Sequence, residues 1–223
     1  MAIKKLDNPV WYALTEFHQN HAINYKNIKF YNPDYAPFGA IAQKENTSLP
    51  ILEYSKLIKN FLIVGEEPII PNSMTLVSKL VGLQMIIYKK IDLPITNKII
   101  ELNDSHTEEL LALVKFVYPE YFKEKTASLG RYYGIFKNEK LIAITGERMQ
   151  MEDFTEVSAV ITHPDYAGNG YAKQLIAHTV NNIFKQDKIP FLHVAETNNG
   201  PIKLYEKLGF ATRRKINFWN MSS

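Results

Sequence analysis

The chain has no cysteine and only a small excess of one charge. Its 223 residues include 26 Lys and Arg against 23 Asp and Glu, a formal net charge of +3. Without cysteine it can form no disulfide and no thiolate metal site, and no covalent mechanism can use a thiolate. The net charge is too small to predict nucleic-acid binding. The basic cluster at residues 213–215 is short, and it suits either solvent or the mouth of an anion site.

Long apolar runs are also missing. No stretch approaches the roughly 20 apolar residues that span a bilayer, and the N-terminus has no signal-peptide core. We therefore expect no membrane partner and a cytoplasmic location. The histidines are scattered: His163, His178 and His193 fall on different expected elements, and no His-Glu-x-x-His spacing occurs. His193 and Glu196 are expected on opposite strand faces, so we predict no metal site.

The most informative segment joins an expected strand to a helix through a glycine loop. Residues 155–161 are rich in β-branched side chains and are typical of a strand, which Pro164 ends. From Tyr171 the apolar residues recur at helical spacing, so a helix begins at or near Gly170. Gly168 and Gly170 therefore lie where the loop enters the helix.

Two interpretations of this loop stay open on the residues alone. Glycines let backbone N–H groups approach an anion, and the positive end of a helix favours phosphate. The alternative is a structural turn at Asn169-Gly170, a common hairpin signal, although the pattern after it is helical. A dinucleotide fingerprint is less suitable, because no third glycine follows at the required place.

A second segment repeats the strand-to-helix pattern. Residues 191–197 are typical of a strand, and Pro201 suits the first turn of a helix after Asn199-Gly200. That helix carries Leu204 and Tyr205 and is expected to stop at Gly209.

Together the two segments resemble the coenzyme-binding half of the GNAT superfamily, the acyl-CoA-dependent N-acyltransferases. Residues 167–172 match the family loop Gln/Arg-x-x-Gly-x-Gly/Ala, except that Ala167 stands at the Gln/Arg position. The family's second pattern, Asn-x-x-Ala-x-x-Leu-Tyr-x-x-x-Gly-Phe, is matched at Asn198, Leu204, Tyr205, Gly209 and Phe210, with Pro201 in place of Ala. The resemblance implies an α+β fold with a mixed sheet.

The resemblance also implies a binding site for acetyl-CoA as co-substrate, with no metal. Amides of the loop would hold the pyrophosphate, and the preceding strand end and Asn198 would contact the pantetheine arm. Lys173 equally fits a solvated surface lysine. The implied coenzyme-binding residues are Ile161, Thr162, His163, Ala167, Gly168, Asn169, Gly170, Tyr171, Ala172, Lys173 and Asn198.

Two residues are implied for catalysis. Tyr205 would protonate the departing thiolate, and the alternative is a packed ring with a solvated hydroxyl. Glu156 precedes Ala167 by eleven positions, the spacing of the base glutamate in the histone-acetylating branch. Alternatives for Glu156 are a solvent-facing strand residue, or a water chain in place of a fixed base. Main-chain amides around residues 160–162 would stabilise the oxyanion.

The rest of the chain is divided at a linker near residues 91–97. Residues 98–223 are expected to form one complete α+β module. Its further elements are a helix over 108–122 capped by Asp104 or Ser105, a hairpin of 132–136 and 141–145, and strands at 147–151 and 212–221. Residues 1–95 are expected as a degenerate acyltransferase-like half that shapes the substrate cleft, a layout similar to that of glycine N-acyltransferase-like proteins. Its expected elements are a helix from Pro9 through Phe17, helices at 52–58 and 76–80, and strands at 61–64 and 83–88.

The resemblance therefore implies an N-acetyltransferase that moves an acetyl group from acetyl-CoA to a primary amine by direct attack in a ternary complex. A small amine or an amino acid is expected ahead of a protein amine. The alternative from another class is a non-catalytic acyl-CoA sensor, because Ala167 lacks the family side chain. The sequence gives no prediction of the oligomeric state.

Overall fold

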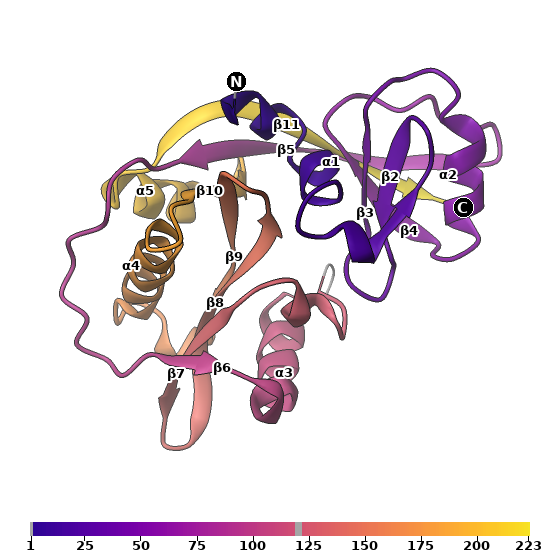
Figure 1. Cartoon of the computed structure of the whole chain (residues 1–223). Helices are drawn as coiled ribbons and strands as arrows, with labels where there is room; N and C mark the ends of the chain where they lie inside the picture. The colour runs from indigo at the N-terminus through magenta and orange to yellow at the C-terminus, as the bar shows by residue number, and fades with distance from the viewer. Residues whose placement is uncertain (1, 119–121) are drawn as a thin grey trace.

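The computed structural model describes residues 2–118 and 122–223 and is built around one mixed sheet (Figure 1). In the described residues the sheet has eleven strands in the order β1-β2-β3-β4-β11-β5-β10-β9-β8-β7-β6. The strands are β1 (Ala22–Asn24), β2 (Ile28–Tyr31), β3 (Phe38–Ile41), β4 (Asn60–Val64), β5 (Thr75–Ile86), β6 (Ile100–Leu102), β7 (Tyr132–Lys137), β8 (Lys140–Gln150), β9 (Phe154–Thr162), β10 (Ile189–Ala195) and β11 (Ala211–Ser222). The expected α+β class with a mixed sheet is confirmed.

The helices are short, apart from two that pack on the sheet. They are α1 (Pro9–Ala13), α2 (Ser48–Ser55), α3 (Thr107–Val117), α4 (Tyr171–Phe184) and α5 (Asn199–Lys207). Short 3-10 helices are η1 (Ala2–Asp7), η2 (Gln19–His21), η3 (Asp104–His106), η4 (Thr126–Leu129) and η5 (Pro164–Tyr166).

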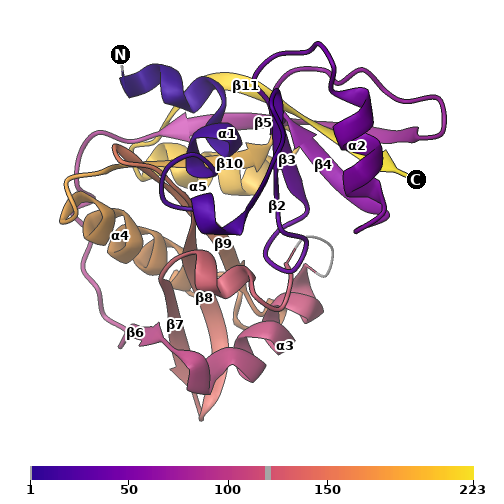
Figure 2. The same cartoon turned by 45° about the vertical axis from the view of Figure 1, so that its right-hand side comes forward.

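Helices α3 and α4 cover opposite faces of strands β7 to β9 (Figures 1 and 2). Successive side chains of a strand point to opposite faces, and β7 follows this rule. Tyr132 packs in the cluster that holds Leu113 and Val114 of α3. Its neighbour Tyr133 packs with Leu175 of α4. The alternation along β7 therefore builds two apolar layers, one on each side of the sheet.

Two long strands join the parts of the chain that precede and follow residue 95. Strand β11 lies between β4 and β5 and pairs antiparallel with both. Strand β5 in turn pairs with β10. The last strand of the chain is thus inserted among the first strands, and Figure 1 shows β5 and β11 running side by side across the molecule.

The connection between β5 and β6, residues 87–99, has no helix or strand but is fixed to α4. The Asn181 amide bonds both the N–H and the carbonyl of Ile91, each at 2.9 Å. Gln174 Oε1 accepts the backbone N–H groups of Thr96 and Asn97 at 2.9 and 3.0 Å. These bonds satisfy the polar groups of an extended segment that has no sheet partner.

Several predicted elements differ from the structure. Residues 76–80, expected as a helix, belong to β5, because pairing with β11 decides their conformation. The expected strands at 141–145 and 147–151 are one strand, β8. Gly146 lies inside this strand and does not break it. Glycine is needed there because a side chain would collide with the ring of Tyr132. The helix from Pro9 ends at Ala13, so Phe17 lies outside it and is exposed.

The helix expected over 108–122 runs from Thr107 to Val117, and residues 119–121 lie outside the described residues. The predicted cap at Asp104 or Ser105 is wrong. The Asn103 side chain accepts the Ser105 N–H at 3.0 Å and forms a capping box with His106. A 3-10 turn, η3, separates this cap from α3.

Candidate functional site

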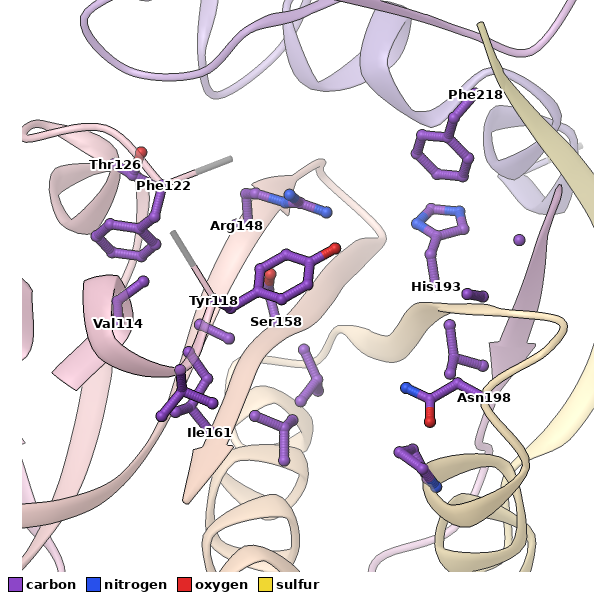
Figure 3. Close-up of a pocket in the computed structure, with 18 of the residues that line it drawn as sticks. Val114, Tyr118, Phe122, Thr126, Arg148, Ser158, Ile161, His193, Asn198 and Phe218 are labelled. Carbon is purple, nitrogen blue, oxygen red and sulfur yellow. The ribbon is translucent and has the colours of Figure 1, made fainter. Parts of the chain in front are cut away.

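Strands β9 and β10 diverge and open a cavity. They pair in parallel only at Phe154–Ile189, Thr155–Pro190 and Glu156–Phe191. Beyond this point the two strands line a cavity of about 340 Å³ (Figure 3). Its walls include Val157, Ser158, Ala159, Val160 and Ile161 of β9, and His193, Val194 and Ala195 of β10.

A β-bulge shapes the β9 wall. Ser158 is opposite Gly146 and Ile161 is opposite Ile144, so Ala159 and Val160 together face only Thr145. Ala159 has φ +48°, a left-handed conformation that costs an alanine roughly 1–2 kcal/mol. The bulge changes the direction of the backbone in the cavity wall, next to the amides around residues 160–162. The role of these amides in stabilising an oxyanion stays a prediction.

The glycine loop leads into α4. Gly168 and Gly170 have φ +80° and +76°, in the left-handed region that favours glycine. Gly170 caps α4 without any side-chain hydrogen bond, which leaves the first-turn N–H groups free for an anion. Asn169 holds the loop by donating to the carbonyls of Tyr166 and Ala167 at 3.1 and 3.2 Å. Because a helix follows the loop, the hairpin alternative is wrong.

The other predicted coenzyme residues fall into three groups. Ile161 and Asn198 line the cavity, and Figure 3 shows the Asn198 amide turned toward it. Thr162 and His163 follow Ile161, and the His163 ring stacks on Phe116 at 4.9 Å. Ala167, Tyr171, Ala172 and Lys173 belong to the loop and the first turn of α4. The Lys173 chain lies against Gly170, where a Cβ would meet its Cε at 2.7 Å.

Tyr205 of α5 is in the cavity wall and only 7% exposed. Its ring packs on Phe210 with centroids 5.9 Å apart. Within residues 2–118 and 122–223, the hydroxyl has no hydrogen-bond partner. Burial raises the pKa of Tyr205 to about 12, so the phenol stays protonated at neutral pH. The role of Tyr205 as the proton donor stays a prediction.

Glu156 lies where β9 and β10 separate and is 1% exposed. Arg148 of β8 donates from Nε to Oε2 at 2.7 Å and from Nη2 to Oε1 at 3.0 Å. His193 Nδ1 lies 2.7 Å from Oε1. Burial alone would raise the pKa of this carboxyl, but the Arg148 charge and the His193 hydrogen bond outweigh burial and hold the pKa well below its usual range.

This arrangement does not favour Glu156 as a base. A carboxylate with a depressed pKa and occupied oxygens is a poor proton acceptor. The alternative of a solvent-facing glutamate is also wrong, because the side chain is buried. Glu156 instead holds Arg148 and His193 in place.

A second hydrogen-bond chain orients the His193 ring. Arg213 Nη1 donates to Gln84 Oε1 at 2.9 Å, and Gln84 Nε2 donates to the carbonyl of Leu6 at 2.8 Å. The same Nε2 lies 3.2 Å from His193 Nε2, which must therefore accept. In this arrangement His193 Nδ1 donates to Glu156 Oε1.

The sequence-based predictions missed Arg148 and Gln84, and compared His193 with Glu196 instead of Glu156. The available signal was a charged or amide side chain next to apolar residues in each of several expected strands. A buried charged group must have a partner, but the sequence does not show which strands are neighbours.

The rest of the cavity wall comes from strands that precede residue 95, from β11, and from the end of α3 and the residues after it. Its side chains are mainly apolar: Phe38 of β3, Leu62 of β4, Leu80 of β5, Phe218 of β11, Val117, Tyr118 and Phe122. The strands that precede residue 95 therefore take part in the cavity.

Two absences among the described residues are relevant to the site. No three His, Asp or Glu side chains in residues 2–118 and 122–223 gather where they could hold a metal ion. In the same residues no helix combines the length and apolarity needed to cross a membrane.

Known proteins similar to this chain include acetyltransferases. The family model described as FR47-like protein matches residues 132–219. A solved structure from Novosphingobium aromaticivorans, assigned to the GNAT family of acetyltransferases, is 28% identical; the match covers 98% of each chain with a TM-score of 0.86. A GCN5-related N-acetyltransferase from Kribbella flavida is 15% identical over 96% of this chain and 93% of that chain, with a TM-score of 0.64. No curated protein matches the sequence.

Proposed function

Since the chain belongs to the GNAT superfamily of acyl-CoA-dependent N-acyltransferases, we propose that it transfers an acetyl group from acetyl-CoA to the primary amine of a small molecule. The observation that carries this proposal is the cavity between the diverging strands β9 and β10, with Tyr205 in its wall. We place the reaction in the cytoplasm, in keeping with a chain that has no cysteine.

The chain's own residues fit the coenzyme. Gly168 and Gly170 with the uncapped start of α4 offer backbone N–H groups to the pyrophosphate. The edge of β9 near Ile161 and the Asn198 amide would hold the pantetheine arm. Acetyl-CoA supplies an activated thioester when bound.

The bulge in β9 and Tyr205 would each act on a different atom of the thioester. Amides next to Ala159 would stabilise the negative charge that develops on the carbonyl oxygen as the amine attacks. The C–N bond forms, the C–S bond breaks, and Tyr205 would give its proton to the departing sulfur. The proton that the attacking nitrogen loses would then return to the tyrosinate, so that the amide and the CoA thiol both leave neutral. Because Glu156 is committed to Arg148 and His193, the amine is expected to bind already neutral.

The first test is thermal unfolding with and without acetyl-CoA, with NAD as the control nucleotide. A ligand at about 100 times its Kd adds about 2.7 kcal/mol of stability, so acetyl-CoA alone should raise the melting temperature. Release of CoA thiol on addition of amines would then establish transfer. An unchanged melting temperature in the presence of acetyl-CoA would contradict the proposed function.

The rival function is a non-catalytic acyl-CoA sensor, which the exposed Ala167 favours because it supplies no side chain to the phosphates. A sensor would bind acetyl-CoA and release no CoA with any amine. Tyr205 in the cavity wall argues for catalysis, since binding alone does not require its hydroxyl.

A further inference from the structure

Arg148 has hydrogen-bonding capacity that the protein does not use. A guanidinium has five N–H donors, and Nε and Nη2 each donate to Glu156. Nη1 takes no part in the two hydrogen bonds to Glu156. The side chain is 17% exposed and lines the cavity. Figure 3 shows the guanidinium extending from β8 into the cavity toward His193.

The free edge of this guanidinium is held rigidly. Its centre lies 4.8 Å from the centroid of the Phe38 ring. Glu156 accepts hydrogen bonds from the other edge of the guanidinium, and a hydrogen bond from His193 holds Glu156 in place. A planar, fixed pair of N–H groups suits a carboxylate, which accepts two parallel hydrogen bonds.

The charges around the cavity point the same way. Arg148 is the only Lys, Arg, Asp or Glu side chain among the described residues that line it. Glu156 lies behind Arg148 and is not in the lining. A polyamine would therefore find no carboxylate to pair with. An acceptor with one amine and one anionic group would complement the cavity.

The other side chains in the cavity wall indicate the size and polarity of the acceptor. Aromatic and aliphatic side chains from β3, β4, β5 and β11 also line the cavity, among them Phe38, Leu62, Leu80 and Phe218. The whole cavity measures about 340 Å³ and must also take the end of the pantetheine arm. The acceptor is therefore small and largely apolar.

We propose that the acceptor is a free amino acid with an apolar or aromatic side chain, and that Arg148 binds its carboxylate. This rests on the proposed N-acetyltransferase activity. It also distinguishes a free amino acid from a protein N-terminus, because a peptide's first carbonyl is neutral and offers Arg148 no charge.

The test uses the unaltered protein and acceptors that differ in one group. L-Phenylalanine carries the carboxylate, L-phenylalaninamide replaces it with a neutral amide as a peptide would, and spermidine supplies a polycation. CoA release is measured with acetyl-CoA, and kcat/KM is expressed per neutral amine, because the amide lowers the amine pKa. Losing a charge-assisted pair costs about tenfold to a hundredfold. Phenylalanine should exceed the amide by that factor, and spermidine should be inactive.

A variant locates the discrimination at Arg148. Arg148→Lys keeps a positive charge beside Glu156 but loses the planar fork, so the ratio of acid to amide should fall to about threefold or less. Arg131→Lys, the same change outside the cavity lining, should keep the wild-type ratio. If Arg148→Lys does not fold, the acceptor comparison on the wild-type protein decides alone.

Turnover of the amide equal to or above that of the acid would overturn the proposal and favour a peptide N-terminus. Preference for spermidine would overturn it as well. If acetyl-CoA raises the melting temperature but no amino acid releases CoA, the acceptor class is wrong while the coenzyme site stands. If acetyl-CoA causes no shift, the proposed function fails first, and the acceptor class fails with it.

Discussion

At the scale of single residues, the Tyr205 hydroxyl is the proton donor that we propose for the departing sulfur. Its pKa of about 12 keeps it protonated across the working range. Tyr205→Phe removes only the hydroxyl, so we expect kcat to fall about a hundredfold, typical of a lost general acid. Affinity for acetyl-CoA should stay within about threefold, since the ring is retained. Steady-state CoA release and calorimetric titration measure the two quantities.

The matched control is Tyr88→Phe, which removes a hydroxyl from an exposed tyrosine outside the cavity lining. It should match the wild type in both measurements. Wild-type kcat in Tyr205→Phe would exclude Tyr205 from the chemistry.

A second residue-scale prediction concerns acid stability. His18 is buried, with Nε2 on the carbonyl of Leu129 at 3.0 Å and Nδ1 on the Tyr31 hydroxyl at 2.7 Å. Burial lowers the pKa of His18 to about 4. Below pH 6.5 the unfolded chain therefore binds a proton that the folded chain does not, and stability falls as the pH drops toward 4.

We expect this histidine to account for about 2 kcal/mol of the stability lost between about pH 7.5 and pH 5. Urea unfolding of the wild type and of His18→Gln at both pH values measures it. The variant should be less stable at the higher pH but should lose less on acidification. Equal losses in the two proteins would mean that His18 is not the group responsible.

How far single residues could be predicted depends on whether their partners are local. Gly168, Gly170 and Asn198 belong to short motifs whose geometry is set within one loop, and the structure gives them the expected conformations or position. Arg148 and Gln84 act through residues on neighbouring strands. Strand pairing is set by the whole sheet, so their roles could not be inferred from spacing.

At the scale of elements, the loop before α4 is the feature whose function can be tested most directly. Gly170→Glu adds a carboxylate at the start of α4, where the proposed pyrophosphate site lies, and we expect acetyl-CoA affinity to fall more than about a hundredfold. The substitution also strains a residue at φ +76°, although its Cβ would meet only the flexible end of Lys173.

Gly65→Glu controls for that strain. Gly65 has φ +103°, and a Cβ added there would have no atom within 4 Å. It lies after β4 rather than at α4. Both variants should lose about 1–2 kcal/mol of stability, but only Gly170→Glu should lose binding. Unchanged affinity in Gly170→Glu would refute the assignment of the loop to phosphate.

Most elements after residue 98 could be predicted because their patterns agree with their surroundings. Strands β9 and β10 and helices α4 and α5 begin and end within a few residues of the expected positions. The prediction for residues 76–80 was wrong because half of β5 is exposed, so its side chains show no strict alternation. Backbone pairing with β11 holds it as a strand, and such pairing leaves no local trace in the sequence.

At the scale of the whole molecule, the structure raises the question of whether residues 1–95 and 98–223 unfold independently. The sheet gives a physical reason to expect that they do not. Strand β11 is paired from Ala211 to Ser222 with β5, and its end also pairs with β4. The C-terminal strand therefore cannot leave without breaking the sheet of the first part. The insertion of β11 between β4 and β5 could not be predicted, because it pairs strands that lie far apart in the sequence.

The two tryptophans report on this coupling. Trp11 lies in α1, and Trp219 of β11 is opposite Ile63 and Lys79, so both belong to the region of the first strands. The proposed coenzyme site lies instead between β9, β10 and α4. In a cooperative sheet, a ligand that stabilises one region stabilises the whole. We therefore expect acetyl-CoA to raise the melting temperature seen by tryptophan fluorescence by the same amount as that seen by far-UV circular dichroism. With NAD neither signal should move. Two separate transitions, with the tryptophan transition unmoved by acetyl-CoA, would mean that the first part is an independent domain and that β11 does not couple it to the site.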